Sequence, residues 1–121
     1  ANRVAVLVPL TGHDAAVGRS IADAARLALL DSGSKAVELT IYDTEQAGAA
    51  AAAIRAIREG NRLILGPLRA EHARAVAPIT QRARVPVIAY SNDVAAAGPG
   101  VFILGFAPGQ AIERVVRHSW Q

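Results

Sequence analysis

The chain has 121 residues, of which 52% are hydrophobic and 19% charged, a composition that suits one compact domain with an aliphatic core and without a membrane-spanning run. A formal net charge of +3 and a pI near 10.2 do not predict nucleic-acid binding, because the arginines are scattered over separate predicted helices without an aromatic platform. The absence of cysteine excludes disulfides, thiol catalysis and cysteine-ligated metals, and it leaves the cellular compartment open.

The beginning of the chain predicts a strand followed by a helix. Residues 4–10 form a short Val-rich run, VAVLVPL, which is typical of a parallel strand covered on both faces. Apolar residues then recur at helical spacing until Gly33, a residue type that commonly follows a helix C-terminus.

A second strand and an Ala-rich helix are predicted next. Residues 37–42, VELTIY, alternate as a half-buried strand does. Asp43 and Thr44 are N-cap candidates for the following helix, because their short polar side chains can accept hydrogen bonds from free backbone N–H groups. We expect Ile54 and Ile57 to mark the buried face of this helix.

The second half of the chain continues the alternation of strands and helices. Residues 63–65 predict a third strand, and residues 70–84 predict a helix that begins soon after a Gly-Pro turn. Two further strands are predicted over residues 85–90 and 101–106, separated by a polar loop. A last helix is predicted over residues 110–120.

This alternation predicts an α/β fold. Crossovers of this kind are right-handed, so we expect a doubly wound parallel five-stranded sheet with helices on both faces and the strand order 2-1-3-4-5. In such sheets ligands bind beyond the carboxyl ends of the strands, at the switch point between strands 1 and 3. Here that point is formed by residues 10–18 and 66–71, with residues 43–44 and 91–93 alongside.

No motif in the sequence predicts catalysis or a cofactor. Residues 12–18, GHDAAVG, lack the Lys and the spacing of a phosphate-binding Walker loop, and the dinucleotide fingerprint G-x-G-x-x-G is absent. His13, His72 and His118 lack the paired spacing that gathers ligands on one metal ion. We therefore predict a protein that is not an enzyme and that works by recognition.

Polar residues at the switch point indicate where recognition takes place. The Thr11 hydroxyl and the backbone around Gly12 and Gly66 can hold a small polar or anionic group by hydrogen bonds. An equally good interpretation is that Gly12 satisfies a turn and that Asp14 caps the first helix. The SND segment after the fourth strand has the same two interpretations: it contacts the ligand, or it forms only a turn.

Four segments taken in order carry a family resemblance: VAVLVPLTG at 4–12, LILGPL at 63–68, VPVIAYSND at 85–93 and GVFILGF at 100–106. Together they resemble the first lobe of type I periplasmic solute-binding proteins of the leucine/isoleucine/valine-binding group. Within that superfamily, GPL followed by AVAP, SND and FILGFAPGQAIERVVRH resembles bacterial penicillin-binding-protein activators, which are envelope lipoproteins. The resemblance covers essentially the whole chain.

The resemblance implies that residues 1–121 are a single N-terminal lobe of a two-lobe protein. In the complete family, the chain crosses into a second similar lobe, and ligand is clamped between the two; that second lobe is absent from this sequence. The resemblance also implies a periplasmic location, with a lipid anchor in the full-length activators. We expect the isolated lobe to be prone to form a homodimer through the sheet edge near its fifth strand.

One segment departs from the pattern of the amino-acid binders. Those proteins usually place Ser or Thr hydroxyls after the Gly-Pro turn, where the hydroxyls hold the ligand carboxylate, whereas this chain has Leu68, Arg69, Ala70 and Glu71. Arg69 can still pair with an anion, but a bulky Leu and a Glu at the helix start are unlike a standard amino-acid pocket. The departure favours the activator or an unusual ligand.

Two functional hypotheses follow from the resemblance. A solute-binding lobe would serve an ABC transporter permease, take an amino acid or another small molecule, and present six residues to it: Thr11, Gly12, Gly66, Arg69, Ser91 and Asn92. An activator-like lobe would instead use a surface to regulate a peptidoglycan synthase and leave the cleft vacant. Neither hypothesis requires a cofactor or a metal.

Overall fold

The computed structural model describes residues 2–89 together with the backbone of residues 101–103. Within these residues it contains a single sheet of five parallel strands in the order β2-β1-β3-β4-β5, which confirms the predicted order. The elements are β1 (Asn2–Val8), α1 (Ala15–Ser32), β2 (Val37–Asp43), α2 (Ala49–Arg58), β3 (Leu63–Leu65), α3 (Ala70–Ala83), β4 (Val87–Ala89) and β5 (Val101–Ile103). Four structural predictions lie outside the described residues: Tyr90 in the fourth strand, the polar loop that follows it, the end of the fifth strand, and the helix over 110–120.

Strand β1 is an inner strand of the sheet, between β2 and β3. It pairs with β2 in a register that runs from Asn2 opposite Val37 to Val8 opposite Asp43, and it pairs with β3 on its other side. All five residues from Val4 to Val8 have no exposed surface. Because all the strands run in the same direction, their carboxyl ends, and the loops that follow them, lie at one edge of the sheet.

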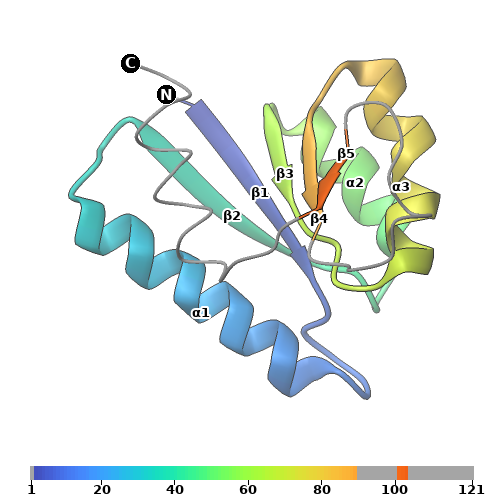
Figure 1. The fold of residues 1–121 in the computed structure, drawn as a ribbon, viewed down its shortest axis with the longest axis horizontal. Coiled ribbons are helices and arrows are strands. Elements are labelled where there is room, and N and C mark those ends of the chain that lie inside the picture. Colours follow the sequence, from blue (N-terminus) through green and yellow to red (C-terminus); the bar gives the residue numbers. More distant parts are fainter. Residues whose placement is uncertain (1, 90–100, 104–121) are drawn as a thin grey trace.

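Helices cover both faces of the sheet, as predicted (Figure 1). Val4, Val6 and Val8 point to one face and pack with Ala22 and Ala25 of α1. The alternate β1 side chains point to the other face, where α2 and α3 cover them. The alternation of side chains along a strand therefore divides the aliphatic core into two layers.

The buried face of α2 differs from the prediction. Ile54 is 40% exposed, so its assignment to the buried face was wrong, while Ile57 is partly buried against the core. The buried residues of this helix are all alanines: Ala49, Ala52, Ala53 and Ala56. These small side chains let the helix lie close to the sheet, and a five-alanine run carries no periodic signal from which this face could have been predicted.

One helix-cap prediction was wrong, and another is met in position only. Gly48 occupies the N-cap position of α2, because β2 continues through Asp43 and a turn follows it; neither Asp43 nor Thr44 caps the helix. Asp14 occupies the N-cap position of α1 but makes no side-chain capping hydrogen bond. Both aspartates are instead bound to other loops at the carboxyl edge, as described below.

Two strands have different bounds from those predicted: β1 begins and ends two residues earlier, at Asn2 and Val8, and β4 begins two residues later. Strand β1 ends at Val8 rather than at Leu10, where Pro9 offers no N–H to a neighbouring strand. Strand β4 begins at Val87, since the Val85 N–H donates to the Thr80 carbonyl (2.9 Å) and so belongs to the end of α3.

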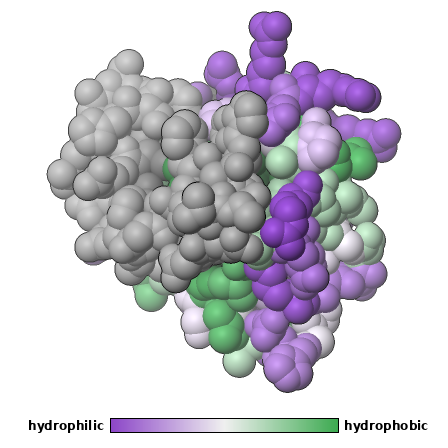
Figure 2. All heavy atoms as spheres, turned by 45° about the vertical axis from the view of Figure 1, so that its right-hand side comes forward, coloured by the Kyte–Doolittle hydropathy of each residue, from purple (hydrophilic) through white to green (hydrophobic). Residues whose placement is uncertain are grey.

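The outer surface beside α2 and α3 is largely hydrophilic in the view that brings that side forward (Figure 2). Among the described residues, the large apolar side chains with high exposure are Val17, Leu27 and Leu30 of α1 and Ile54 of α2. No helix in this part of the chain combines the length and the apolarity needed to cross a bilayer.

Candidate functional site

Asp43 joins the first two loops at the carboxyl edge. Its Oδ1 accepts hydrogen bonds from the backbone N–H groups of Leu10 (2.9 Å) and Glu45 (3.0 Å), and its Oδ2 accepts one from the Thr11 hydroxyl (2.8 Å). Burial raises the pKa of the Asp43 carboxyl, but these hydrogen bonds outweigh burial and hold the pKa below its usual range. The loop after β1 is therefore attached to the end of β2 by a charged acceptor.

This arrangement predicts a specific loss of stability in acid. Because the folded-state pKa of Asp43 lies below the unfolded value, its carboxylate stabilises the fold above the unfolded pKa, near about 3.9, and this contribution is lost as the pH falls through the folded pKa. Asp43→Asn should lower the free energy of unfolding by about 1–2 kcal/mol at pH 7, because hydrogen bonds to a neutral acceptor are weaker.

Urea unfolding at a series of pH values from neutral to about 2.5 measures both effects. The wild-type protein should lose more stability below about pH 4 than Asp43→Asn does, and Asp23→Asn, which removes an exposed carboxylate on α1, is the matched control. Identical pH profiles for the wild type and Asp43→Asn would contradict the assigned role of Asp43.

Arg69 joins three loops at the same edge. It directly precedes α3, and its guanidinium lies 3.0 Å from Glu45 Oε1, 3.5 Å from Glu71 Oε1 and 3.7 Å from Asp14 Oδ2. One guanidinium therefore faces three carboxylates, which leaves the cluster with an excess of negative charge. The side chain is 42% exposed, so solvent screens these pairs and each contributes little to stability.

The two glycines of the predicted site have different roles. Gly12 has a φ of 79° and lies in the turn that leads into α1, where its carbonyl accepts from the Ala15 N–H at 3.4 Å. Gly66 has a φ of 104°, and a Cβ added there would lie 2.2 Å from the Leu7 carbonyl oxygen of β1. Its N–H donates to the Ile88 carbonyl (2.8 Å) and so is used by the sheet.

The structure brings together part of the predicted site. Thr11 and Arg69 lie at one edge, linked through Asp43 and Glu45, and a Cβ on Gly12 would lie 4.0 Å from Glu45 Cγ. Gly66 is buried behind them. Ser91 and Asn92 lie outside the described residues, so their contribution stays a prediction.

Sequence reasoning missed two acidic partners of Arg69 in this site, Asp14 and Glu45. It also missed that Gly18 of α1 lies against the Pro9 carbonyl. One signal was available: Asp43 ends the strand next to β1, and parallel neighbours end at the same edge. Among the described residues, no group of three or more His, Cys, Asp or Glu side chains could hold a metal ion.

A parallel lobe of order 2-1-3-4-5 with its polar loops gathered at the carboxyl edge defines a binding lobe of the doubly wound α/β class. The profile of the family described as periplasmic binding protein matches residues 2–121. The chain therefore belongs to the periplasmic binding protein family, and its fold is that of a type I lobe.

Solved structures and curated relatives that resemble this chain include solute-binding proteins and penicillin-binding protein activators. A leucine-binding protein, LivK from Thermotoga maritima, is 29% identical and superposes over 85% of this chain and 33% of its own with a TM-score of 0.76. The C-domain of LpoA from Haemophilus influenzae, described as a regulator of PBP1A, superposes over 85% of this chain and 33% of that domain, with 20% identity and a TM-score of 0.70. The penicillin-binding protein activator LpoA of Photobacterium profundum is 36% identical over 76 residues, which are 61% of this chain and 12% of that protein.

The chain spans only part of these proteins. An uncharacterized protein from Rickettsia prowazekii is 29% identical over 119 residues, which cover 95% of this chain but 31% of the relative. The chain therefore corresponds to about a third or less of the length of the curated relatives it matches.

Proposed function

We propose that the chain is the non-catalytic N-terminal lobe of a bacterial envelope protein that recognises a protein partner, as penicillin-binding-protein activators do, and does not hold an amino acid at its carboxyl edge. The single observation that carries this proposal is that the two predicted side-chain donors among the described residues, Thr11 and Arg69, are engaged within the lobe. Thr11 donates to Asp43, and Arg69 is paired with three carboxylates.

The charge of the edge supports the same proposal. A ligand carboxylate approaching Arg69 would meet Glu45, Glu71 and Asp14, all of which repel it. To accept the ligand, Arg69 would have to leave these partners, and a hydrogen bond to a charged group contributes about 1.5–3 kcal/mol. A site built to bind carboxylates would keep its donors free.

The alternative is a substrate-binding lobe for an ABC transporter, which would have a permease as its partner. The 29% identity to the leucine-binding protein LivK favours it, since that identity exceeds the 20% shared with the LpoA domain. In favour of the activator, the 76 residues that match the Photobacterium protein are 36% identical. The two candidates share the proposal of a periplasmic protein with a second lobe, and the activator adds a lipid anchor.

Titration of the full-length protein with leucine, isoleucine and valine by calorimetry tests the proposal. We expect no saturable heat with the wild type or with Arg69→Ala, because Arg69 is already paired. Arg58→Ala, at the exposed end of α2, is the control for loss of one positive charge. Purification of the full-length protein from envelope extracts should recover a peptidoglycan synthase.

The opposite results would replace the proposal by the alternative. Micromolar amino-acid binding corresponds to about 8 kcal/mol, well within the range of calorimetry. If the wild type binds one of these amino acids and Arg69→Ala binds it at least tenfold more weakly, the lobe is a solute receptor. Binding that Arg58→Ala weakens equally would assign the effect to net charge rather than to the site.

A further inference from the structure

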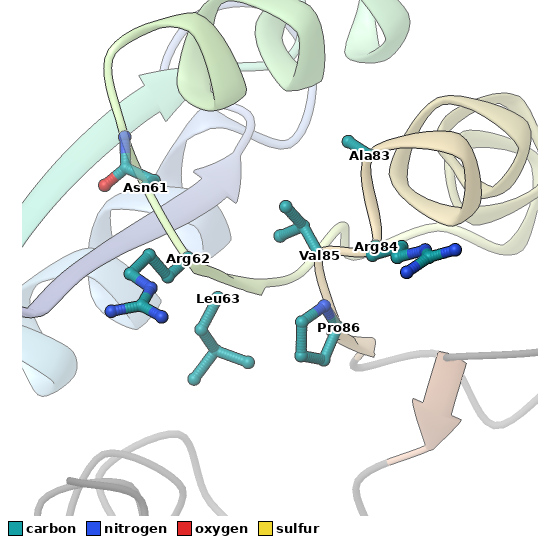
Figure 3. Close-up of a pocket in the computed structure, with 7 residues that line it drawn as sticks. All are labelled: Asn61, Arg62, Leu63, Ala83, Arg84, Val85 and Pro86. Atoms are coloured by element: carbon teal, nitrogen blue, oxygen red, sulfur yellow. The ribbon is translucent and has the colours of Figure 1, made fainter.

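A pocket lies at the amino end of the sheet, opposite the carboxyl edge. It has a volume of about 500 Å³, which is within the range of small-molecule sites. Among the described residues, its lining comes from the start of β3 and from the segment between α3 and β4: Asn61, Arg62, Leu63, Ala83, Arg84, Val85 and Pro86 (Figure 3). None of these lining residues is acidic.

Two of the lining side chains carry uncompensated positive charge. Arg62 and Arg84 are exposed, and neither side chain has a hydrogen-bond or ion-pair partner within residues 2–89. Figure 3 shows them flanking Leu63, Val85 and Pro86 from opposite sides. The carboxylates of Glu38 and Glu59, also near the amino end of the sheet, are already bound by Arg3 and Arg55. An anion is therefore attracted to this pocket.

A third lining residue leaves a hydrogen-bond acceptor unused. Asn61 is 4% exposed, and its Nδ2 donates to the Tyr42 hydroxyl (2.9 Å) and to the Ala56 carbonyl (2.8 Å). Its Oδ1 is buried and has no partner. Buried acceptors in native proteins are normally satisfied, so Oδ1 can accept from a ligand that carries a donor besides its anionic group, and it offers nothing to the anionic group itself.

The backbone of Arg84 adopts a conformation that is unusual for a residue with a side chain. Arg84 ends α3 in the left-handed conformation, with a φ of 58°, and it is the one non-glycine residue with positive φ among those described. Glycine is the usual residue in such a position, because it lacks the Cβ that makes this conformation costly.

We propose that this pocket binds a small organic anion, a carboxylate or phosphate group attached to an apolar body. Arg62 and Arg84 hold the anionic group, and Leu63, Val85 and Pro86 contact the apolar body. The site is separate from the carboxyl edge of the lobe, so its occupation does not depend on which candidate function is correct.

Amide chemical shifts of the full chain, measured by NMR during titration with benzoate, with inorganic phosphate and with sodium chloride of matched ionic strength, test the proposal. We expect saturable shifts at Leu63 and Val85 with at least one of the two probes and none with sodium chloride. Binding of benzoate alone shows that the apolar wall is required, and binding of phosphate alone shows that the anionic group is sufficient.

Substitutions inside and outside the pocket distinguish binding in the pocket from a general effect of positive charge. Arg62→Ala with Arg84→Ala should weaken binding at least tenfold, whereas Arg58→Ala with Arg82→Ala removes the same charge from the last turns of α2 and α3, outside the pocket, and should change it less than twofold. Arg84→Gly should lose affinity without lowering the melting temperature, because glycine suits the left-handed backbone. Equal loss in both double variants, or no saturable binding of either probe, would overturn the proposal.

Discussion

Gly66→Ala should destabilise the protein by about 3–5 kcal/mol, because two independent penalties act at this residue. Its φ of 104° is costly for any residue with a Cβ, and the added Cβ would lie 2.2 Å from the Leu7 carbonyl oxygen and 3.1 Å from its carbon. Both neighbours are backbone atoms of β1, an inner strand whose residues from Val4 to Val8 are fully buried, so relief of the contact requires the sheet itself to move. Thermal unfolding of the full chain should show a fall in Tm of about 10 °C or more.

Gly48→Ala is the matched control for this prediction. Gly48 has a similar φ of 93°, but a Cβ added there meets nothing within 4 Å. Its substitution therefore isolates the backbone penalty, about 1–3 kcal/mol, because a ψ of 159° places Gly48 in a region that is essentially restricted to glycine. If the two variants melt within a few degrees of each other, the chain that follows β3 does not pass as close to β1 as the structure shows.

Gly18→Ala should also destabilise the protein by about 3 kcal/mol or more, although alanine is the better helix former. Gly18 is the one glycine inside a described helix, and a Cβ added there would lie 1.6 Å from the Pro9 carbonyl oxygen. Helix propensity alone would make the substitution stabilising by about 1 kcal/mol. The contact between α1 and the end of β1 reverses the sign, since α1 must move off the sheet to make room.

Ala16→Gly provides the opposite substitution at an exposed position two residues earlier in the same helix. It should cost about 1 kcal/mol through propensity alone. Urea unfolding of both variants gives the comparison, and a Gly18→Ala variant as stable as the wild type would show that α1 packs less closely than the structure indicates. Displacement of α1 would also move Asp14 away from Arg69, so the same variant should loosen the carboxyl edge.

The sheet order was predictable because it depends on features that local sequence carries. The apolar run of β1, the alternation of β2 and the short loops between elements require parallel crossovers, and their right-handed connection allows few arrangements. The same reasoning placed Thr11 and Arg69 at one edge, since parallel strands all end there. The family resemblance rested on the same segments and was confirmed.

The pairing within that edge was not predictable from sequence. Arg69 could have been a free anion-binding residue as far as its neighbours in sequence indicate, but the loops after β1 and β2 bring Asp14 and Glu45 to it. Asp43, expected to cap α2, instead binds the loop after β1.

Strand order follows from hydrophobic periodicity and chain connectivity, and both can be recognised in the sequence. The partner of a charged side chain follows from which loops meet at the edge and how closely they approach. That approach is set by contacts between residues far apart in the chain, such as Gly18 against Pro9 and Gly66 against Leu7, so it became visible only in the folded protein.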